Sequence, residues 1–377
     1  NQTLYNSSSD SININSKANF TVLTRNNSFT TKAKLVAGSS DLFYLKGNGN
    51  LYAWGSDDYG QEGVYTGNGL LKVSLVMSGV KLVSTSQGGS VGNSPHTLVL
   101  TGDNRLFSAG NNNNGQLGRT GLTSVFLPVV SVPSGTIVDI SAGYDHSLIL
   151  MSNGDLYGLG NNTYGQLGNT NLGGQVNSFI KLATNVKAMA AGRRHTLYIT
   201  NDGALYGLGD NRWSKMVVGD QMYTIPVLIT SNAKAVFAGE HSSFVIDNNN
   251  DLYYFGWRSA VTLNSEEGDG RLHKLLGNVE SVSMQDEHAM ILTLDGKAYG
   301  WGVNTYSQVT SGTVTQSTPV LISQSAVGTA AGTGFSAILN SDGSITVWGK
   351  NTAGIAGNGS SSISIPKTTI SASKFNW

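Results

Sequence analysis

The sequence predicts an all-β protein with the fold of a seven-bladed β-propeller, in which repeats of about 50 residues each form a four-stranded antiparallel blade. Three observations lead to this prediction. A glycine that closes a strand recurs seven times at nearly constant spacing, short apolar runs are bounded by turn residues, and tight hairpin signals separate two of these runs in four copies.

The recurring glycine defines the repeat. Successive copies of this glycine are 55, 50, 49, 47, 46 and 47 residues apart. With the residue before each, they are Trp54-Gly55, Ala109-Gly110, Leu159-Gly160, Leu208-Gly209, Phe255-Gly256, Trp301-Gly302 and Trp348-Gly349. A unit of this size cannot bury both faces alone, so stacked units fold together. We therefore expect one propeller domain over residues 34–377, with residues 1–33 as an N-terminal arm or closing strand.

The third copy shows the strands most clearly. Short runs at 139–142, 147–150 and 155–160 are bounded by Gly, Asn or Asp and are too short for helices. The hairpin signal between the last two runs is a dipeptide that favours positive φ. The four copies of this signal are Asn153-Gly154, Asp202-Gly203, Asp295-Gly296 and Asp342-Gly343. A variable segment with a proline follows in several copies, as at 127–130, and suits an outer edge strand.

The chain ends also contain strand-like segments. Residues 3–5 and 19–23 have strand patterns, and propellers usually close by pairing strands from both ends of the chain. We expect an N-terminal strand, or residues 373–377, to complete a blade. The start at Asn1, without methionine or signal peptide, leads us to expect a processed or trimmed chain.

The composition argues against several classes of function. Lysine plus arginine equals aspartate plus glutamate at 23 each, which argues against a nucleic-acid surface and against an anionic membrane surface. No apolar run reaches the roughly 18 residues of a membrane-spanning helix, so we expect no membrane insertion. The absence of cysteine excludes disulfides and thiolate chemistry. Low charge and abundant Gly, Asn, Ser and Thr favour an extracellular or cell-surface location.

The copies resemble the repeat of the regulator of chromosome condensation family. The resemblance covers roughly residues 34–377 and includes Gly-Gln-Leu-Gly loops at 115–118 and 165–168, with a decayed copy at 60–63. It implies the propeller fold. It leaves the function open, because the family includes an exchange factor, a plant photoreceptor, ubiquitin ligase domains and a secreted β-lactamase inhibitor.

Two of these functions fit this chain poorly. The photoreceptor needs Gly-Trp-Arg-His-Thr turns, whereas this chain has Arg193 in the tryptophan position, before Arg194 and His195. Nothing resembles an added basic tail for chromatin.

The sequence predicts no catalytic residues, no metal and no cofactor. His96, His146, His195 and His288 hold the same repeat position in different blades, so they form a ring rather than a metal cluster. We expect each imidazole to be partly buried and bonded to neighbouring backbone. Asp286 and Glu287 are adjacent, which does not suit a glycosidase pair. No nucleophile elbow, phosphate loop or zinc helix occurs, and we predict that the protein is not an enzyme.

The candidate site is a loop-rich face of the ring. Two sets of loops share it, namely the turn before the histidine and the loop after the strand-closing glycine. Their aromatic and arginine side chains are typical of binding hot spots. The candidate residues are Tyr59, Tyr144, Tyr164, Arg193, Arg194, Trp213, Trp257 and Tyr306.

Two alternatives stay open for these residues. The aromatic rings suit packing between blades as well as binding. Arg193 and Arg194 either recognise an acidic group on a partner or form a salt-bridge belt with Glu240 and Asp145.

We therefore predict a non-catalytic, extracellular protein-binding platform whose partner is another protein or a copy of itself. One alternative is a structural subunit of a filament, sheath or surface layer that assembles through its N-terminal arm, because an extended strand can add to an exposed sheet edge. A polysaccharide-acting enzyme is the remaining alternative.

Overall fold

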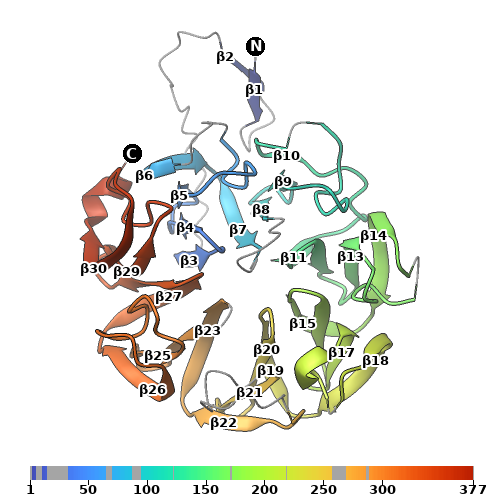
Figure 1. Ribbon diagram of the computed structural model, residues 1–377. Coiled ribbons are helices and arrows are strands. Elements are labelled where there is room, and N and C mark those ends of the chain that lie inside the picture. The colour runs from blue at the N-terminus through green and yellow to red at the C-terminus, as the bar shows by residue number, and fades with distance from the viewer. Residues whose placement is uncertain are drawn as a thin grey trace.

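Seven four-stranded antiparallel sheets form a ring in the computed structural model (Figure 1), so the predicted seven-bladed β-propeller is confirmed. The structure describes residues 2–5, 11–14, 33–64, 70–86, 95–121, 123–169, 172–217, 219–256, 269–285 and 288–376. Within them, helix is confined to the 3₁₀ turns η1 (Arg212–Ser214) and η2 (Ala372–Phe375). No helix of this described part is long and apolar enough to span a membrane.

The first four blades follow one another along the chain. Blade 1 contains β3 (Lys34–Ala37), β4 (Asp41–Leu45), β5 (Leu51–Gly55) and β6 (Leu70–Met77). Blade 2 contains β7 (Val80–Thr85), β8 (His96–Thr101), β9 (Leu106–Gly110) and β10 (Leu127–Pro128). Blade 3 contains β11 (Ile137–Ala142), β12 (His146–Met151), β13 (Leu156–Asn161) and β14 (Gln175–Ala183). Blade 4 contains β15 (Val186–Ala191), β16 (His195–Thr200), β17 (Leu205–Asp210) and β18 (Met222–Thr230).

The last three blades complete the ring. Blade 5 contains β19 (Ala233–Ala238), β20 (Ser242–Asp247), β21 (Leu252–Gly256) and β22 (His273–Leu276). Blade 6 contains β23 (Val279–Gln285), β24 (His288–Thr293), β25 (Ala298–Gly302) and β26 (Gln316–Ser323). Blade 7 contains β27 (Ala326–Gly332), β28 (Phe335–Asn340), β29 (Ile345–Asn351) and β30 (Ser362–Ile370).

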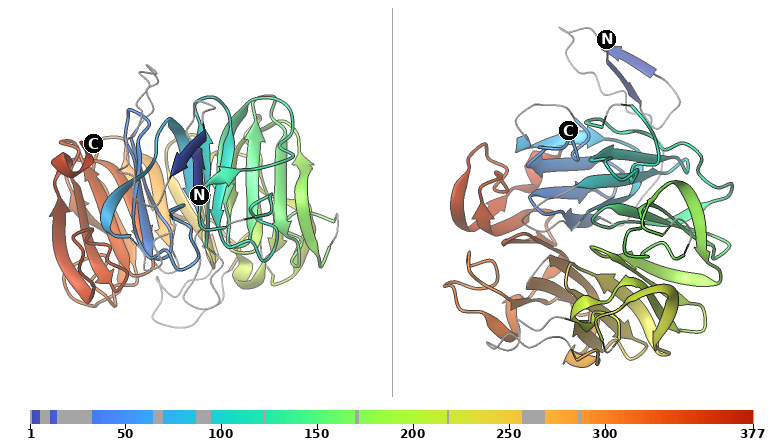
Figure 2. Two further views of the ribbon diagram at one scale, coloured as in Figure 1. Left: turned by 90° about the horizontal axis from the view of Figure 1, so that it is seen from above. Right: turned by 45° about the vertical axis from the view of Figure 1, so that its right-hand side comes forward.

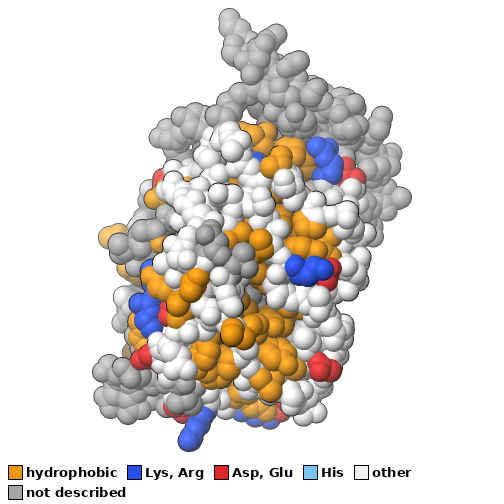
Figure 3. All heavy atoms as spheres, turned by 90° about the vertical axis from the view of Figure 1, so that its right-hand side faces the viewer, with side chains coloured by type: hydrophobic (Ala, Val, Ile, Leu, Met, Phe, Trp, Pro, Cys, Tyr) orange, Lys and Arg blue, Asp and Glu red, His pale blue; other side chains and the backbone are white. Residues whose placement is uncertain are grey.

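Strands pair in chain order within every blade, so the first strand lies at the ring centre and the fourth at the rim (Figure 1). The side view in Figure 2 shows the strands running through the thickness of the disc, which gathers the loops on its two faces. Prolines lie in rim strands as predicted, at Pro128, Pro226 and Pro319. The rim also exposes apolar side chains, which Figure 3 shows on the side of the disc where β14 and β18 lie; Ile225 of β18 is an example.

The described strands do not show the predicted closure of a blade by a terminal strand. Each blade is built from four consecutive strands, and among the described strands β1 (Gln2–Tyr5) and β2 (Ser11–Ile14) pair only with each other. The prediction of a strand at 3–5 is confirmed, whereas the one at 19–23 lies outside the described residues. The C-terminal segment predicted as a strand forms η2 instead.

Side-chain packing closes the ring where blade 7 meets blade 1. The ring of Phe375 is buried against Tyr44 and Tyr52, with centroid distances of 4.8 and 5.4 Å. The Tyr52 hydroxyl donates to the Phe375 carbonyl at 2.9 Å, and Trp54 Nε1 donates to the carbonyl of Ile355 at 2.8 Å. An aromatic plug between the first and last blades therefore takes the place of a shared strand.

The core lies between neighbouring sheets rather than inside any one of them. In one cluster Leu148 and Leu156 of blade 3 pack with Val186 and Met189 of blade 4. The predicted hairpins join adjacent blades as well, because the carbonyl of Gly154 accepts the Val186 N–H of the following blade at 2.9 Å. Each blade is thus stable only against its neighbours.

The strand-closing glycine is required by close backbone approach. At Gly160 φ is +109°, and an added Cβ would lie 2.6 Å from the Asp145 carbonyl oxygen and 2.7 Å from the His146 Cα. The glycines at the other six copies also have positive φ. The repeat pattern therefore records a steric requirement at the face that bears the candidate site.

We predict that Gly160→Ala lowers the free energy of unfolding by about 2 kcal/mol more than Gly121→Ala does. Gly121 has a similar φ of +96° but no atom within 4 Å of an added Cβ. Both substitutions therefore carry the left-handed backbone strain, and only the first adds the clash. Denaturant unfolding of both variants measures the difference, and equal losses would contradict the steric argument.

Candidate functional site

A buried ring of histidines supports the loop face. Each of the four repeat histidines begins the second strand of its blade. Its Nε2 atom forms a hydrogen bond with a side-chain hydroxyl of the following blade. The pairs are His96–Ser147 at 2.8 Å, His146–Thr196 at 3.1 Å, His195–Ser243 at 2.9 Å and His288–Ser336 at 3.0 Å. The expectation of partly buried imidazoles bonded to backbone needs correction, because these rings are buried and their shared partner is a side-chain hydroxyl. His288 also has the expected kind of partner, since its Nε2 lies 3.1 Å from the Phe335 carbonyl oxygen.

The other three blades hold different residues at this ring position. Asp41, Ser242 and Phe335 pair across the sheet with the strand-closing glycine, as His146 does in blade 3. His241 therefore lies one residue earlier, on the loop face. Within the described part of the chain no group of three or more His, Asp or Glu side chains is placed to hold a metal.

Burial favours the neutral form of His146, His195 and His288. Desolvation lowers the pKa of His146 to about 3 and that of His288 to about 4. A group whose pKa is lowered in the folded state takes up protons on unfolding, so its contribution to stability falls as pH drops below the unfolded value near 6.5. Burial also raises the pKa of Asp41 to about 7 and that of Asp145 to about 6. These two groups change the stability with pH in the opposite direction, and over an overlapping pH range.

We predict that the stability advantage of the wild type over His146→Asn shrinks by ~3 kcal/mol between pH 7.5 and pH 4. The wild type alone carries the cost of keeping this imidazole neutral, while the buried aspartates are common to both proteins and cancel in the difference. Urea unfolding at several pH values measures it. A difference that does not change with pH would show that His146 is not held neutral.

Backbone hydrogen bonds between blades align the turns that precede the ring position. The N–H of Tyr144 donates to the carbonyl of Gly192 at 3.2 Å, and the N–H of Arg193 donates to the carbonyl of Gly239 at 3.1 Å. Corresponding residues of blades 3, 4 and 5 therefore stand side by side on the loop face.

An inner row of side chains follows from this alignment. The Arg193 guanidinium lies 5.2 Å from the Tyr144 ring centroid and forms an ion pair with Glu240 of blade 5. Tyr144 and Glu240 are buried, while Arg193 is partly exposed. The predicted belt between Arg193 and Glu240 is therefore present.

An outer row is formed by the loops after the third strands, each of which leans over the following blade. The Tyr164 ring of blade 3 has the Arg194 guanidinium of blade 4 at 4.4 Å and that of Arg212 at 5.3 Å. Trp213 of blade 4 packs edge-on against His241 of blade 5 at 4.6 Å. Three blades thus share one continuous stack of aromatic rings and cations.

The loop at 210–220 of blade 4 departs from the other blades. Lys215 takes the place of the repeat glutamine, and its side chain is fully buried, with Nζ 3.4 Å from Asp210 Oδ2. Burial lowers the pKa of Lys215 to about 8, although Asp210 opposes the shift. Burial would raise the pKa of Asp210, but hydrogen bonds from Arg212 and the charge of Lys215 hold it well below its usual range.

This replacement explains an unusual backbone. In blades 3 and 6 the glutamine side chain accepts the N–H of Tyr164 at 3.0 Å and of Tyr306 at 2.8 Å. Lysine offers no acceptor, so the N–H of Trp213 donates to Asp220 Oδ1 at 2.8 Å instead, and φ of Trp213 is +63°. Left-handed backbone at a bulky residue is strained and clusters at functional sites.

We predict that Asp210→Asn lowers the free energy of unfolding by about 3 kcal/mol, because it leaves the buried Lys215 ammonium without its carboxylate. Adding Lys215→Gln, which restores the repeat residue, recovers a large part of this loss. A double-mutant cycle by chemical denaturation measures the coupling. Strictly additive effects would show that the two side chains do not depend on each other.

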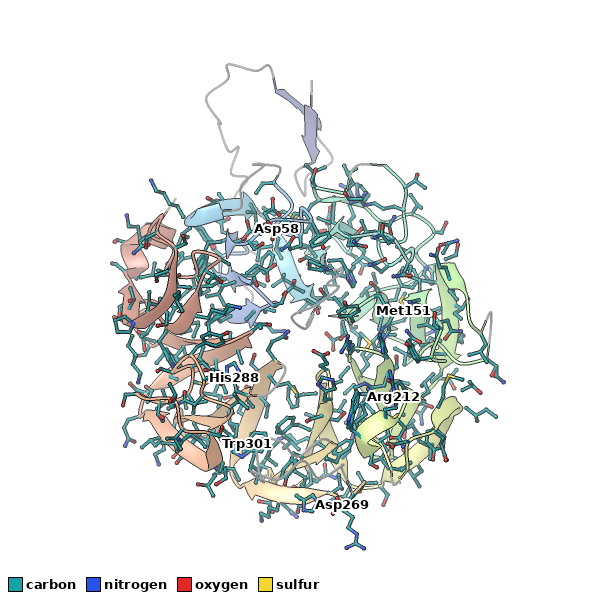
Figure 4. All side chains as sticks on the ribbon, in the orientation of Figure 1. Asp58, Met151, Arg212, Asp269, His288 and Trp301 are labelled. Carbon is teal, nitrogen blue, oxygen red and sulfur yellow. The ribbon has the colours of Figure 1, made fainter. Side chains whose placement is uncertain are left out.

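The structure gathers five of the eight candidate residues on blades 3 to 5. We define the blade 3–5 cluster as Tyr144, Tyr164, Arg193, Arg194, Arg212, Trp213, Lys215, Glu240 and His241, together with Asp145 and Asp210. Sequence reasoning about binding residues missed Arg212 and Lys215, although a lysine in place of the repeat glutamine was a usable signal. Figure 4 shows Arg212 on blade 4, on the other side of the ring centre from His288.

The remaining candidates lie apart from these contacts. Tyr306 pairs with Lys350 of blade 7, at 5.4 Å. Tyr59 is half exposed, and its phenol is a minor influence on the pKa of Tyr144, which burial raises. Trp257, Asp286 and Glu287 lie outside the described residues.

Comparison with known proteins identifies the family. The fold and the repeats define a seven-bladed propeller in which four blades bond to the next blade through a buried histidine. The family model of the RCC1-like domain matches residues 72–375, and this chain belongs to that family. Propellers of this family often bind other proteins.

Curated relatives match over short stretches. The ultraviolet-B receptor UVR8 of Arabidopsis thaliana is 29% identical over 166 residues, which cover 40% of this chain and 38% of the receptor. The X-linked retinitis pigmentosa GTPase regulator of Mus musculus is 32% identical over 116 residues, which cover 29% of this chain and 11% of that protein. The matches thus span well under half of these relatives' length.

Solved structures share the fold. Human WBSCR16 superimposes with a TM-score of 0.73 at 17% identity, over 85% of this chain and 94% of that one. Prp20p of Saccharomyces cerevisiae, whose structure is described with its binding to Gsp1p and histones, gives a TM-score of 0.72 at 20% identity, over 90% and 88%. At these identities the likeness shows the fold alone.

Proposed function

We propose that this protein is a non-catalytic binding platform that engages a partner protein through the blade 3–5 cluster. The observation that carries the proposal is the continuous stack of aromatic rings and cations across three blades. Tyr164, Arg194 and Trp213 are each partly exposed within it, while the residues beneath them are buried. Aromatic and arginine side chains in such settings supply most of the energy of protein interfaces.

Rigidity of the cluster supports this proposal. Its side chains are held by contacts between blades and by ion pairs, so few rotamers remain to be ordered when a partner binds. Relatives point to the same class of partner, because Prp20p is described as binding Gsp1p and histones, and another structure has Kap60 bound to it.

The cluster offers little to the enzymatic alternative. Asp145 accepts hydrogen bonds from the amides of Asn161 and Gln166, and Asp210 is bound by Arg212 and Lys215. These hydrogen bonds and ion pairs give both carboxylates structural partners, which supports a non-catalytic role. An extracellular location, supported by the low charge and the lack of cysteine, is part of the proposal. Assembly through the N-terminal arm and the absence of nucleic-acid binding stay predictions.

We predict that Tyr164→Ala and Trp213→Ala each lower partner affinity at least about ten-fold, because both remove hot-spot rings from the cluster. The measurement is affinity capture from the native source on immobilised wild type and variants, with captured proteins quantified by mass spectrometry. The partner is a protein retained by the wild type and lost from both variants.

Tyr306→Ala is the matched control. Tyr306 occupies the same repeat position as Tyr164 and packs on the next blade, where an added Cβ at Gly334 would lie 2.8 Å from its ring. This variant should lose similar thermal stability but keep the partner. Equal loss of binding in all three variants would mean that stability, not the cluster, controls capture, and binding that survives in all three would refute the site.

A further inference from the structure

Charges in the blade 3–5 cluster are almost fully paired. Arg193 forms an ion pair with Glu240, and Arg212 binds Asp210 through Nε and Nη2 at 2.8 to 3.1 Å. Lys215 is buried beside the same Asp210. Burial lowers the pKa of His241 to about 4, so this ring adds no charge near neutral pH.

Arg194 is the exception. Its guanidinium lies 4.4 Å from the Tyr164 ring centroid. Its charge opposes the rise that burial causes in the pKa of Asp145, but no hydrogen bond or ion pair joins its side chain to any part of the chain that the structure describes. Asp145, the neighbouring carboxylate, is instead bound by Asn161 at 2.8 Å and by Gln166 at 3.5 Å. The hydrogen-bond donors of Arg194 therefore remain available on the loop face.

The backbone fixes where this side chain starts. The carbonyl of Arg194 accepts the N–H of Asp210 at 2.8 Å, and the next residue, His195, is anchored in the buried ring. With its base held and its guanidinium resting on Tyr164, the side chain loses little freedom on binding an anion. Arginine in this setting presents a planar fork that matches a carboxylate.

Charge balance selects the ligand. The cations Arg193, Arg194, Arg212 and Lys215 face the carboxylates Asp145, Asp210 and Glu240, which leaves a single positive charge in excess. A singly charged carboxylate balances this excess, whereas a phosphate group with nearly two negative charges exceeds it.

We propose that Arg194 is the receptor for one carboxylate of the partner, supplied by an aspartate or glutamate side chain or by a chain terminus. This inference rests on the proposed function, since it assigns the anchoring chemistry of the same face. Tyr164 positions the guanidinium, and the paired Arg193 and Arg212 flank it without competing for the ligand.

Side-chain NMR of arginine-labelled full-length protein tests the carboxylate site without the partner. The Nε–Hε signal of Arg194, assigned by its loss in Arg194→Lys, is followed during titration at constant ionic strength. The probes are N-acetyl-glutamate N-methylamide for a side-chain carboxylate and N-acetylglycine for a terminal one. N-acetyl-glutamine N-methylamide is the neutral control, and inorganic phosphate is the doubly charged one.

We expect a saturable shift at Arg194 with one or both carboxylates, about ten-fold tighter than at Arg271 and absent with the glutamine probe. Arg271 is exposed and stacks on no ring among the described residues, so it reports non-specific ion binding. The tighter carboxylate identifies the source. A shift at Arg194 no larger than at Arg271, or tighter binding of phosphate, would overturn the proposal.

Affinity-capture experiments distinguish failure of the carboxylate receptor from failure of the proposed binding platform. Arg194→Lys keeps the charge but removes the fork, and we expect it to lower partner retention together with Arg194→Ala. If Tyr164→Ala and Trp213→Ala abolish capture while both Arg194 variants retain it, the platform stands and the carboxylate receptor fails. If Arg194 binds the probes but none of these variants affects capture, Arg194 is an anion site without a role in partner binding, and both the platform and its carboxylate receptor fail.

Discussion

The structure depends on contacts between blades, because no four-stranded sheet of this chain buries both of its faces alone. Imidazole–hydroxyl bonds such as His146 to Thr196 join neighbours near one face, and carbonyl–amide bonds such as Gly154 to Val186 join them near the hairpins. The apolar clusters likewise span two blades. Cooperative folding of the propeller therefore depends on these repeated contacts between blades. A residue in such a contact is constrained by the two blades that meet there.

This constraint also builds the candidate site. Residues at one repeat position lie at equivalent places on successive blades. Side chains at that position in adjacent repeats are therefore neighbours on the loop face. Tyr164 meets Arg194 because the loop after β13 leans over blade 4, and Trp213 meets His241 by the same geometry one blade further on. Lys215, in place of a glutamine, adds a buried charge and strains Trp213, so blade 4 holds the greatest departure from the repeat within the cluster.

Periodicity made the fold predictable, since the spacing of strand-closing glycines reports a steric need that recurs in every blade, as at Gly160. Ring closure was not predictable in the same way. Phe375 packs against blade 1 in a contact that occurs once in the chain, so it leaves no periodic pattern in the sequence. The sequence predicted which loops share one face but not how their side chains pair. The stack of Arg194 on Tyr164 depends on how far one loop reaches across the next blade, which spacing along the chain does not encode.

The loop-face aromatics Tyr164 and Trp213 pack between blades, and this role supports the proposed one of binding a partner. Tyr164 and Trp213 bridge adjacent blades and remain partly exposed, so the packing that stabilises the propeller also fixes the aromatic rings that we propose a partner contacts. A side chain ordered before binding loses less entropy in the complex than a free one. The strained, left-handed backbone of Trp213 is explained in the same way. Contact with blade 5 stabilises a conformation that an isolated loop would not keep.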